Sequence, residues 1–180
     1  QTKFSHPPAK ISVNLSLKQL REPDFLEKID RILTETEIAG ESLNLELTES
    51  MLMDNVEELI FVLGQLRARN IRLSIDDFGT GYSSLSRLHD LPIDTLKIDR
   101  SFVNHLESSR HTEIVQTIVT LARSLGIDAV AEGIETQLQL EKLQQLGCDL
   151  GQGYLFSQPV HSQKAEKWLL NVIGYIDPEE

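Results

Sequence analysis

Several polar residues stand at the carboxyl ends of short apolar runs, where a buried strand would not be expected to place them. They are Asn14, Glu46, Asp76 with Asp77, Lys97 with Asp99, Glu132 and Gln152. If the strand ends met at one rim, four carboxylates would converge there, from Glu46, Asp76, Asp77 and Glu132. Carboxylates in a partly desolvated site repel one another strongly unless cations lie between them. The sequence therefore predicts a cation site.

The donor atoms of this predicted site favour magnesium or manganese. They are carboxylate oxygens joined by one neutral amide, that of Asn14. Hard oxygen ligands suit Mg²⁺ or Mn²⁺ better than zinc, which prefers His and Cys. Two such ions held close together can activate one water and stabilise both the attacking and the leaving oxygen in phosphodiester hydrolysis. Lys97, among carboxylates, would be charged and placed to orient that water or the phosphate.

The net charge limits the partners of the chain. Against 17 Lys and Arg residues stand 28 Asp and Glu residues, which gives a net charge of −11 and a pI near 4.9. Such a chain does not hold nucleic-acid polymers or anionic membranes by broad electrostatic attraction. A pair of divalent cations would let this acidic protein bind a phosphate anion nonetheless.

Each of these polar residues also has a structural interpretation on its own. An Asp-Asp pair such as Asp76 and Asp77 often forms a helix cap or a surface turn, and residues 97–100 could form a solvated salt-bridge cluster. Asn14 could be a satisfied buried amide, and Glu135 could merely stand beside the N-cap Thr136. A separate structural explanation would, however, be needed at each of six consecutive strand ends, and a shared site explains all six together.

The elements that must position these residues are short strands alternating with amphipathic helices, a pattern typical of parallel βα units. The predicted strands are Ile11–Leu15, Leu43–Leu47, Ile71–Ile75, Thr95–Ile98, Ile127–Ala131 and a weaker one at Cys148–Tyr154. Asp54 with Glu57 and Thr136 with Gln139 predict capping boxes at helix starts, and Gly126 and Gly147 stand where helices should end.

The distribution of polar residues over many strand ends favours a barrel over a doubly wound sheet. A doubly wound sheet concentrates its site at one switch point, whereas a barrel gathers groups from many strands around one mouth. A closed barrel of this type has eight strands and about 250 residues. We therefore expect an α/β fold, a TIM-like barrel with about six of its eight βα units, lacking two on the N-terminal side. An open barrel would expose the edge of the 11–15 strand and favour dimerisation or strand exchange.

Composition indicates an intracellular protein. Cys148 is the only cysteine, so no internal disulfide or multi-cysteine zinc site can form. No run of 18 apolar residues exists, and residues 1–10 lack the apolar centre of a signal peptide. We expect residues 1–180 to be a single partial domain, cytoplasmic and without membrane contact of its own.

Six motifs in order resemble the EAL-domain family of cyclic di-GMP phosphodiesterases, from about Ile11 to Val160. They are Ser-Val-Asn-Leu-Ser (12–16), Glu-Leu-Thr-Glu (46–49), Asp-Asp-Phe-Gly-Thr-Gly-Tyr-Ser-Ser-Leu (76–85), Leu-Lys-Ile-Asp (96–99), Ala-Glu-Gly-Ile-Glu (131–135) and Gly-Gln-Gly-Tyr-Leu-Phe-Ser-Gln-Pro (151–159). The resemblance implies a modified TIM barrel, a homodimer, and hydrolysis of cyclic di-GMP to linear pGpG. It also implies a bacterial signalling protein that carries further sensory or signalling domains.

The same resemblance implies roles for individual residues. The first metal would be held by Asn14, Glu46 and Asp76, and the second by Asp76, Asp77 and Glu132. Lys97 would contact the nucleophilic water or the phosphate, and Glu49 would steady the loop at 78–84, which the family associates with dimerisation and metal occupancy. Asp99, Glu135, Gln152 and Gly153 match further substrate-binding or supporting positions.

One departure from the family pattern leaves alternatives open. The Glu-Ala-Leu motif that names the family is absent from these 180 residues, and its glutamate would ligate the first metal. A rival interpretation is therefore a non-catalytic module that binds cyclic di-GMP or a protein partner without turnover. Another barrel metalloenzyme, an enolase-like proton abstractor using Lys97, fits the chemistry but not the full motif set.

Overall fold

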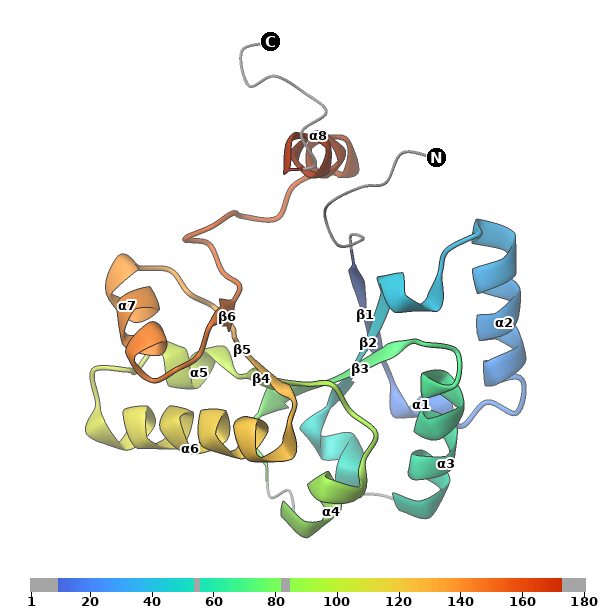
Figure 1. Ribbon diagram of the computed structural model, residues 1–180, viewed down its shortest axis with the longest axis horizontal. Helices are drawn as coiled ribbons and strands as arrows, with labels where there is room; N and C mark the ends of the chain where they lie inside the picture. The colour runs from blue at the N-terminus through green and yellow to red at the C-terminus, as the bar shows by residue number, and fades with distance from the viewer. Residues whose placement is uncertain (1–9, 54–55, 82–84, 173–180) are drawn as a thin grey trace.

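Six parallel strands form one curved sheet in the order β1-β2-β3-β4-β5-β6 (Figure 1). In this computed structural model, residues 10–53, 56–81 and 85–172 are described. The strands are β1 (Ile11–Leu15), β2 (Leu43–Thr48), β3 (Arg72–Phe78), β4 (Thr95–Ile98), β5 (Asp128–Ala131) and β6 (Leu150–Gly151). Each strand pairs with the next one along the chain, so every connection is a crossover that carries a helix over the sheet.

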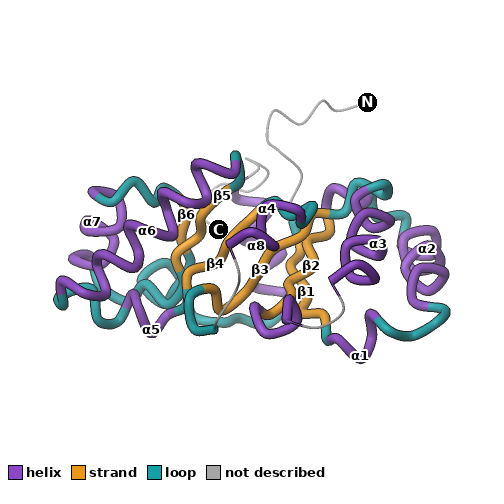
Figure 2. Tube along the Cα trace, turned by 90° about the horizontal axis from the view of Figure 1, so that it is seen from below, coloured by secondary structure: helices purple, strands orange, loops and turns teal. Residues whose placement is uncertain are grey.

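The helices lie mainly on the convex side of the sheet, as Figures 1 and 2 show from two directions. They are α1 (Leu17–Leu20), α2 (Phe25–Thr36), α3 (Val56–Arg67), α4 (Leu85–Asp90), α5 (Arg100–Val103), α6 (Ser109–Leu125), α7 (Gln137–Gln145) and α8 (Ser162–Val172), with short 3₁₀ helices at Gly40–Ser42 and Glu49–Met53. Helices α2 and α3 flank one end of the sheet and α6 and α7 the other, while α8 lies across the open side in Figure 1. None of the helices in the described ranges is long and apolar enough to cross a membrane.

Alternation along the strands separates an apolar face from a polar one. Leu73 and Ile75 of β3 and Leu96 of β4 are completely buried and belong to the hydrophobic core. Ser74 and Lys97, which alternate with them, lie on the concave face instead. Because side chains alternate between the two faces of a strand, this pattern places the core between sheet and helices and leaves polar groups on the inner face.

The predicted strands are largely confirmed: β2 and β5 differ from their predicted bounds by one residue, and β3 and β6 differ by more. The observed β1 and β4 have the predicted bounds. Strand β3 was predicted to end at Ile75, but it continues to Phe78 and includes both aspartates. The predicted strand at 148–154 is only the two residues of β6, because the next residues turn to bond with the β5–α7 connection: Gln152 N donates to Ala131 O and Ile134 N to Gln152 O.

Helix boundaries follow the capping signals where these lie in the described residues. Thr136 and Gln139 form the predicted capping box of α7, and α6 ends at Gly126, which has a φ of 71°. A second box, Ser16 with Gln19, starts α1 and was not predicted. The box predicted at Asp54 lies outside the described residues.

The sheet is an open part of a barrel. Among the described residues, β1 and β6 are the outer strands and do not pair with each other. The side chains of Ile11 and Val13 on β1 are 56% and 44% exposed, and Leu150 on β6 is 48% exposed. The predicted α/β fold with six βα units is confirmed, and the sheet curves into an open arc (Figure 1).

Candidate metal centre

Lys97 lies at the centre of the polar concave face. Its Nζ donates to Glu46 Oε2 at 2.6 Å, to Asp76 Oδ1 at 3.0 Å and to Glu132 Oε1 at 2.6 Å. The side chain of Lys97 is only 7% exposed, and its three partners are exposed by 9%, 16% and 14%. Residues of four neighbouring strands or strand ends, β2 to β5, thus meet at one buried ammonium group.

These contacts keep Lys97 charged. Burial by itself disfavours the ammonium form, but hydrogen bonds to Glu132, Glu46 and Asp76 outweigh it and hold the pKa of Lys97 above its usual range. The ammonium group therefore neutralises part of the negative charge of the cluster. The sequence-based expectation that Lys97 is charged among carboxylates agrees with this geometry.

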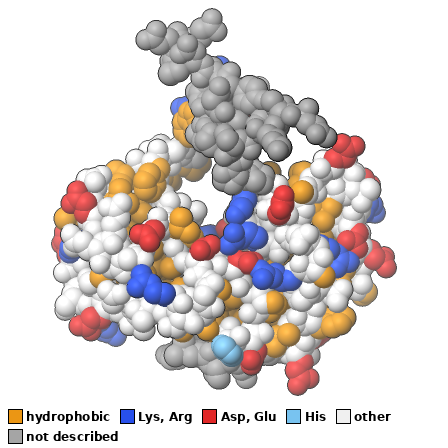
Figure 3. Space-filling model, viewed as in Figure 1, with side chains coloured by type: hydrophobic (Ala, Val, Ile, Leu, Met, Phe, Trp, Pro, Cys, Tyr) orange, Lys and Arg blue, Asp and Glu red, His pale blue; other side chains and the backbone are white. Residues whose placement is uncertain are grey.

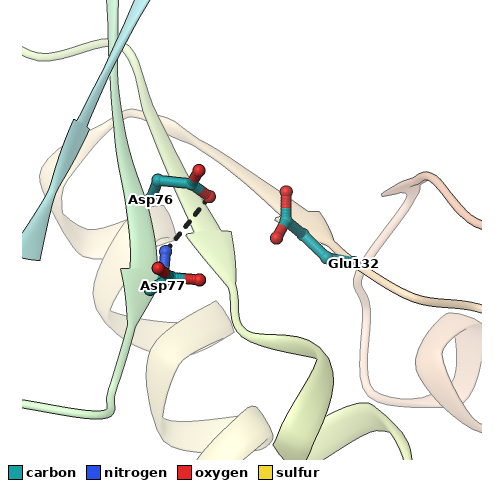
Figure 4. A group of neighbouring side chains, drawn as sticks. All are labelled: Asp76, Asp77 and Glu132. Carbon is teal, nitrogen blue, oxygen red and sulfur yellow. Dashed lines mark hydrogen bonds between the residues drawn. The ribbon is translucent and has the colours of Figure 1, made fainter. Parts of the chain in front are cut away.

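Asp76, Asp77 and Glu132 form the group best suited to hold a cation. One carboxylate oxygen of each lies within 4.8 Å of those of the other two. Figure 4 shows the side chains of both aspartates, from β3, on the side of Glu132, which follows β5. The cluster contains neither His nor Cys, so its donor set is made of hard oxygens, as magnesium and manganese require.

A local irregularity of β3 brings the two adjacent aspartates to the same side. Consecutive residues of a regular strand point to opposite faces. The register of β3 against β4 shifts between Ile75 and Phe78, and Asp77 has a φ of 52°. Aspartate is among the few residues that adopt this left-handed conformation readily. Asp77 N donates to Asp76 Oδ1 at 3.1 Å, which fixes the turn (Figure 4).

Asp77 and Glu132, two members of this group, have pKa values above their usual ones. Burial, followed by the negative charges of Asp76 and Asp99, raises the pKa of Asp77. Burial also raises the pKa of Glu132, although the contact with Lys97 opposes this. Like charges held together in this way are the situation that a bound cation relieves.

Gln152 and Asp99 support the cluster from its margin. Gln152 Nε2 donates to Glu132 Oε1 at 2.7 Å, which orients that carboxylate. Asp99, predicted at the same strand end as Lys97, follows β4 and caps α5, where its Oδ1 accepts from Ser101 N at 3.0 Å. From that position the negative charge of Asp99 still helps to raise the pKa of Asp77.

Asn14 lies next to Glu46 without a direct bond to the lysine. The two residues are register partners in β1 and β2, so their side chains leave the sheet on the same face. The side chain of Asn14 is exposed. It therefore lies beside the cluster, with its amide oxygen available to a ligand that sits near Glu46.

Glu49 contacts the glycine-rich loop and is 97% buried, with 3% exposure. Its Oε2 accepts from Gly79 N at 2.9 Å and from Gly81 N at 3.0 Å. Gly79 has a φ of 99°, and a β carbon there would lie 2.9 Å from Phe102 Cε2. The described part of the loop is thus held between Glu49 and α5, directly after Asp77.

An open cavity of about 620 Å³ adjoins Glu132. It is lined by Arg100, Glu132, Gly133, Glu135, Gln152, Gly153, Tyr154, Ser157, Gln158, Pro159, Val160, Ala165 and Trp168. Figure 3 shows acidic and basic side chains around the hollow of this face. Glu135 is exposed at its wall, whereas Gly153 is required for packing, because a β carbon there would lie 2.2 Å from Ile134 O.

Some residues of this region are outside the predicted site. Arg100, Tyr154 and Trp168 line the cavity, and Trp168 is 40% exposed. Asn44 lies within β2, where it bonds to Ser12, Ser74 and Glu46. The signal that points to Asn44 is the alternation of faces along a strand, since Asn44 and Glu46 are two positions apart on β2.

Comparison with known proteins identifies related sequences. A family described as the EAL domain matches residues 1–159. The chain is 42% identical over 165 residues to the cyclic di-GMP phosphodiesterase NbdA of Pseudomonas aeruginosa. The matched region covers 91% of this chain and 21% of NbdA. It is 41% identical over 160 residues to the bifunctional diguanylate cyclase/cyclic di-GMP phosphodiesterase MucR of the same organism. The chain spans about a fifth of the length of these curated relatives.

Solved structures agree with this relationship. The MucR phosphodiesterase in complex with cyclic di-GMP superposes with a TM-score of 0.83 at 41% identity, covering 87% of this chain and 64% of that one. BlrP1 of Klebsiella pneumoniae, solved with manganese and cyclic di-GMP, has a TM-score of 0.77 at 34% identity, covering 83% of this chain and 39% of that one. Both similarities cover more than four fifths of this chain.

Proposed function

The chain belongs to the EAL domain family, and we propose that it is a phosphodiesterase that hydrolyses cyclic di-GMP to linear pGpG with Mg²⁺ or Mn²⁺. The observation that carries the proposal is the convergence of carboxylates from separate strands on one face, with three of them able to share a cation. Related proteins named as phosphodiesterases, and a relative solved with manganese and cyclic di-GMP, support it.

The proposal has two overlapping ligand sets. Asp76, Asp77 and Glu132 would hold one ion, which the closeness of their carboxylates supports. Glu46 with Asn14 and Asp76 would hold the other, which the pairing of Asn14 with Glu46 in neighbouring strands supports. A bound pair of divalent cations supplies an activated water and neutralises the charge that develops on the phosphodiester. The all-oxygen donor set fits either magnesium or manganese.

The chain's own residues would orient the reactants. Lys97 is positioned to donate a hydrogen bond to the attacking water or to a phosphate oxygen once its carboxylate partners turn to a cation. Gln152 fixes the orientation of Glu132, and Glu49 holds the loop after Asp77 through two backbone N–H groups. These contacts reduce the reorganisation needed when substrate binds.

We assign the substrate to the open cavity beside Glu132. Its wall carries cationic Arg100, anionic Glu135 and the aromatic rings of Tyr154 and Trp168, groups that can bond to and stack on a purine nucleotide. In the whole protein we expect a homodimer and further signalling domains, in line with the bifunctional name of the relative MucR.

Substitution of the proposed ligands tests this function. Glu46→Ala and Asp76→Ala should each lower metal-dependent hydrolysis of cyclic di-GMP by at least about a hundredfold, because an essential ligand is lost. Glu41→Ala removes an exposed glutamate of the first 3₁₀ helix and should leave the rate unchanged. Normal hydrolysis by both ligand variants would show that the metal assignment is wrong.

A non-catalytic cyclic di-GMP receptor is the second candidate. One observation favours it: the ammonium group of Lys97 pairs with three carboxylates of the centre. The cluster thus contains a cation of its own, as a receptor that needs no metal would. Calorimetric titration with cyclic di-GMP separates the two functions. A receptor should bind the intact nucleotide equally well with divalent cations or with EDTA, whereas the phosphodiesterase should release linear product only with the cations.

A further inference from the structure

We propose that Asn44 is a positioning residue that fixes the carboxylate of Glu46 for metal binding. This inference rests on the proposed function and extends it to a residue outside the predicted ligand sets. Asn44 stands two positions before Glu46 on β2, so the two side chains leave the strand on the same concave face. Both line the inner surface of the sheet, below the rim at which the carboxylates converge.

The amide of Asn44 is held from both neighbouring strands. Its Nδ2 donates to Ser12 Oγ on β1 at 2.9 Å, and its Oδ1 accepts from Ser74 Oγ on β3 at 2.9 Å. These two bonds fix the plane of the amide group. They direct the same Nδ2 toward Glu46 Oε1 at 3.5 Å, and the ionised carboxylate can only accept, so the NH₂ side must face it.

The two oxygens of Glu46 thereby have different partners. Oε1 faces Asn44, and Oε2 accepts from Lys97 Nζ at 2.6 Å. A cation that takes the place of the ammonium group would meet Oε2 of a carboxylate whose other oxygen is already held. Asn44 thus favours one orientation of Glu46, and outer partners of this kind commonly change metal affinity by about 10- to 100-fold.

Thr95 provides an internal comparison. It stands two positions before Lys97 on β4, as Asn44 stands before Glu46 on β2, and it lines the same inner surface. Among the bonds of the described residues, none joins the Thr95 hydroxyl to Lys97 or to Glu46. A substitution at Thr95 therefore changes the same inner surface of the sheet but leaves the contact between Asn44 and Glu46 in place.

Manganese affinity measured by electron paramagnetic resonance of free Mn²⁺ tests the role without requiring turnover. Asn44→Ala should weaken Mn²⁺ binding about 10-fold or more. The Mn²⁺ affinity of Thr95→Ala should stay within about twofold of that of the wild-type chain. Ser74→Ala removes only one of the two bonds that hold the Asn44 amide, so its affinity should lie between those of Asn44→Ala and Thr95→Ala. Circular dichroism of each variant shows whether it is folded, and Ser74→Ala keeps the test available if Asn44→Ala does not fold.

A second pair of variants separates positioning from a general structural effect. In a Glu46→Gln background, Asn44→Ala should cause no further loss of Mn²⁺ affinity, because its effect acts through the Glu46 carboxylate. An equal loss in both backgrounds, or wild-type affinity in Asn44→Ala, would contradict the positioning role alone. A wild-type chain that takes up no Mn²⁺ would contradict the proposed function as well.

Discussion

Among single residues, Lys97 is the central positive charge of the metal-free cluster. It neutralises three carboxylates in a mostly buried cluster. Removing one partner of a buried ion pair leaves uncompensated charge and costs about 3–5 kcal/mol. Lys97→Met should therefore lower the free energy of unfolding in EDTA by about that amount, measured by urea denaturation, and added Mn²⁺ should restore part of it.

Lys28 supplies the matched comparison for this prediction. It also has two acidic partners, Glu22 at 2.6 Å and Asp24 at 3.0 Å, but they lie on the surface. Lys28→Met should change the free energy of unfolding by less than about 1 kcal/mol. Equal losses in the two variants would mean that the Lys97 cluster is not an electrostatic centre of the fold.

Asp77 predicts a pH-dependent difference in stability. Burial and nearby negative charges raise its folded pKa above the ordinary value of 3.8. The metal-free fold is therefore favoured when Asp77 is protonated, below pH 3.8, and this advantage is lost as the pH rises through the raised folded pKa. Asn keeps the size and tolerates the left-handed φ of 52°.

Asp77→Asn should consequently stabilise the metal-free chain at pH 7 by less than about 1 kcal/mol, since the group is largely exposed. The gain should disappear in acid, where the wild-type carboxyl is neutral too. Thermal unfolding in EDTA across the pH range measures it. A variant less stable than wild type at pH 7 would contradict the like-charge account of this group.

The positions of single residues could be predicted where the alternation of side chains along a strand determines which face of the sheet they occupy. Glu46, Asp76 and Lys97 alternate with buried apolar residues and lie together as predicted. Asp77 joins them only through a left-handed backbone that the sequence does not display. Asn44 was not predicted because it does not stand at the carboxyl end of a strand. Its role depends on hydroxyl groups of two neighbouring strands.

At the scale of elements, the segment after β3 links the metal centre to α5 and α6. Gly79 has a φ of 99°, and a β carbon there would lie 2.9 Å from Phe102 Cε2 and 3.1 Å from Ile118 Cδ1. Gly79→Ala should therefore cost about 1–3 kcal/mol of stability. It should also weaken Mn²⁺ binding, because Asp77 lies two residues before it.

Gly64 is the control for this prediction. It lies within α3, and a β carbon there would meet no atom within 4 Å. Gly64→Ala should stabilise the chain by up to about 1 kcal/mol through higher helix propensity. Chemical denaturation of both variants gives the comparison, and a Gly79→Ala chain as stable as Gly64→Ala would show that the loop has room to shift.

The order and type of the elements could be predicted because β-rich apolar runs and helix caps are local signals. Strands β1 and β4 and the capping box of α7 have their predicted positions. The extension of β3 through Phe78 depends on an irregular register with β4, and the shortness of β6 depends on bonds from Gln152 to the β5–α7 connection. Both are tertiary effects that local patterns do not contain.

At the scale of the whole molecule, the open sheet predicts self-association. Within the described residues β1 is an outer strand, and its Ile11 is 56% exposed. Exposed apolar edge strands pair with other chains, and a lysine on the edge blocks such pairing. Ile11→Lys should shift the chain toward monomer in sedimentation velocity runs at several concentrations.

Ile32→Lys is the corresponding control, because Ile32 is 48% exposed but lies on α2 rather than on a strand. It should leave the association of the chain close to that of wild type. If both variants associate like the wild-type chain, the edge of β1 is not the contact surface.

The central claim is that the carboxylates gathered by this sheet bind divalent cations that hydrolyse cyclic di-GMP. Incubation of the chain with cyclic di-GMP and Mn²⁺, followed by chromatographic separation of the products and a matched incubation in EDTA, tests it most directly. Linear pGpG should form with Mn²⁺ and be absent with EDTA. Cyclic di-GMP that stays intact with Mn²⁺, or a linear product that forms equally fast in EDTA, would contradict it.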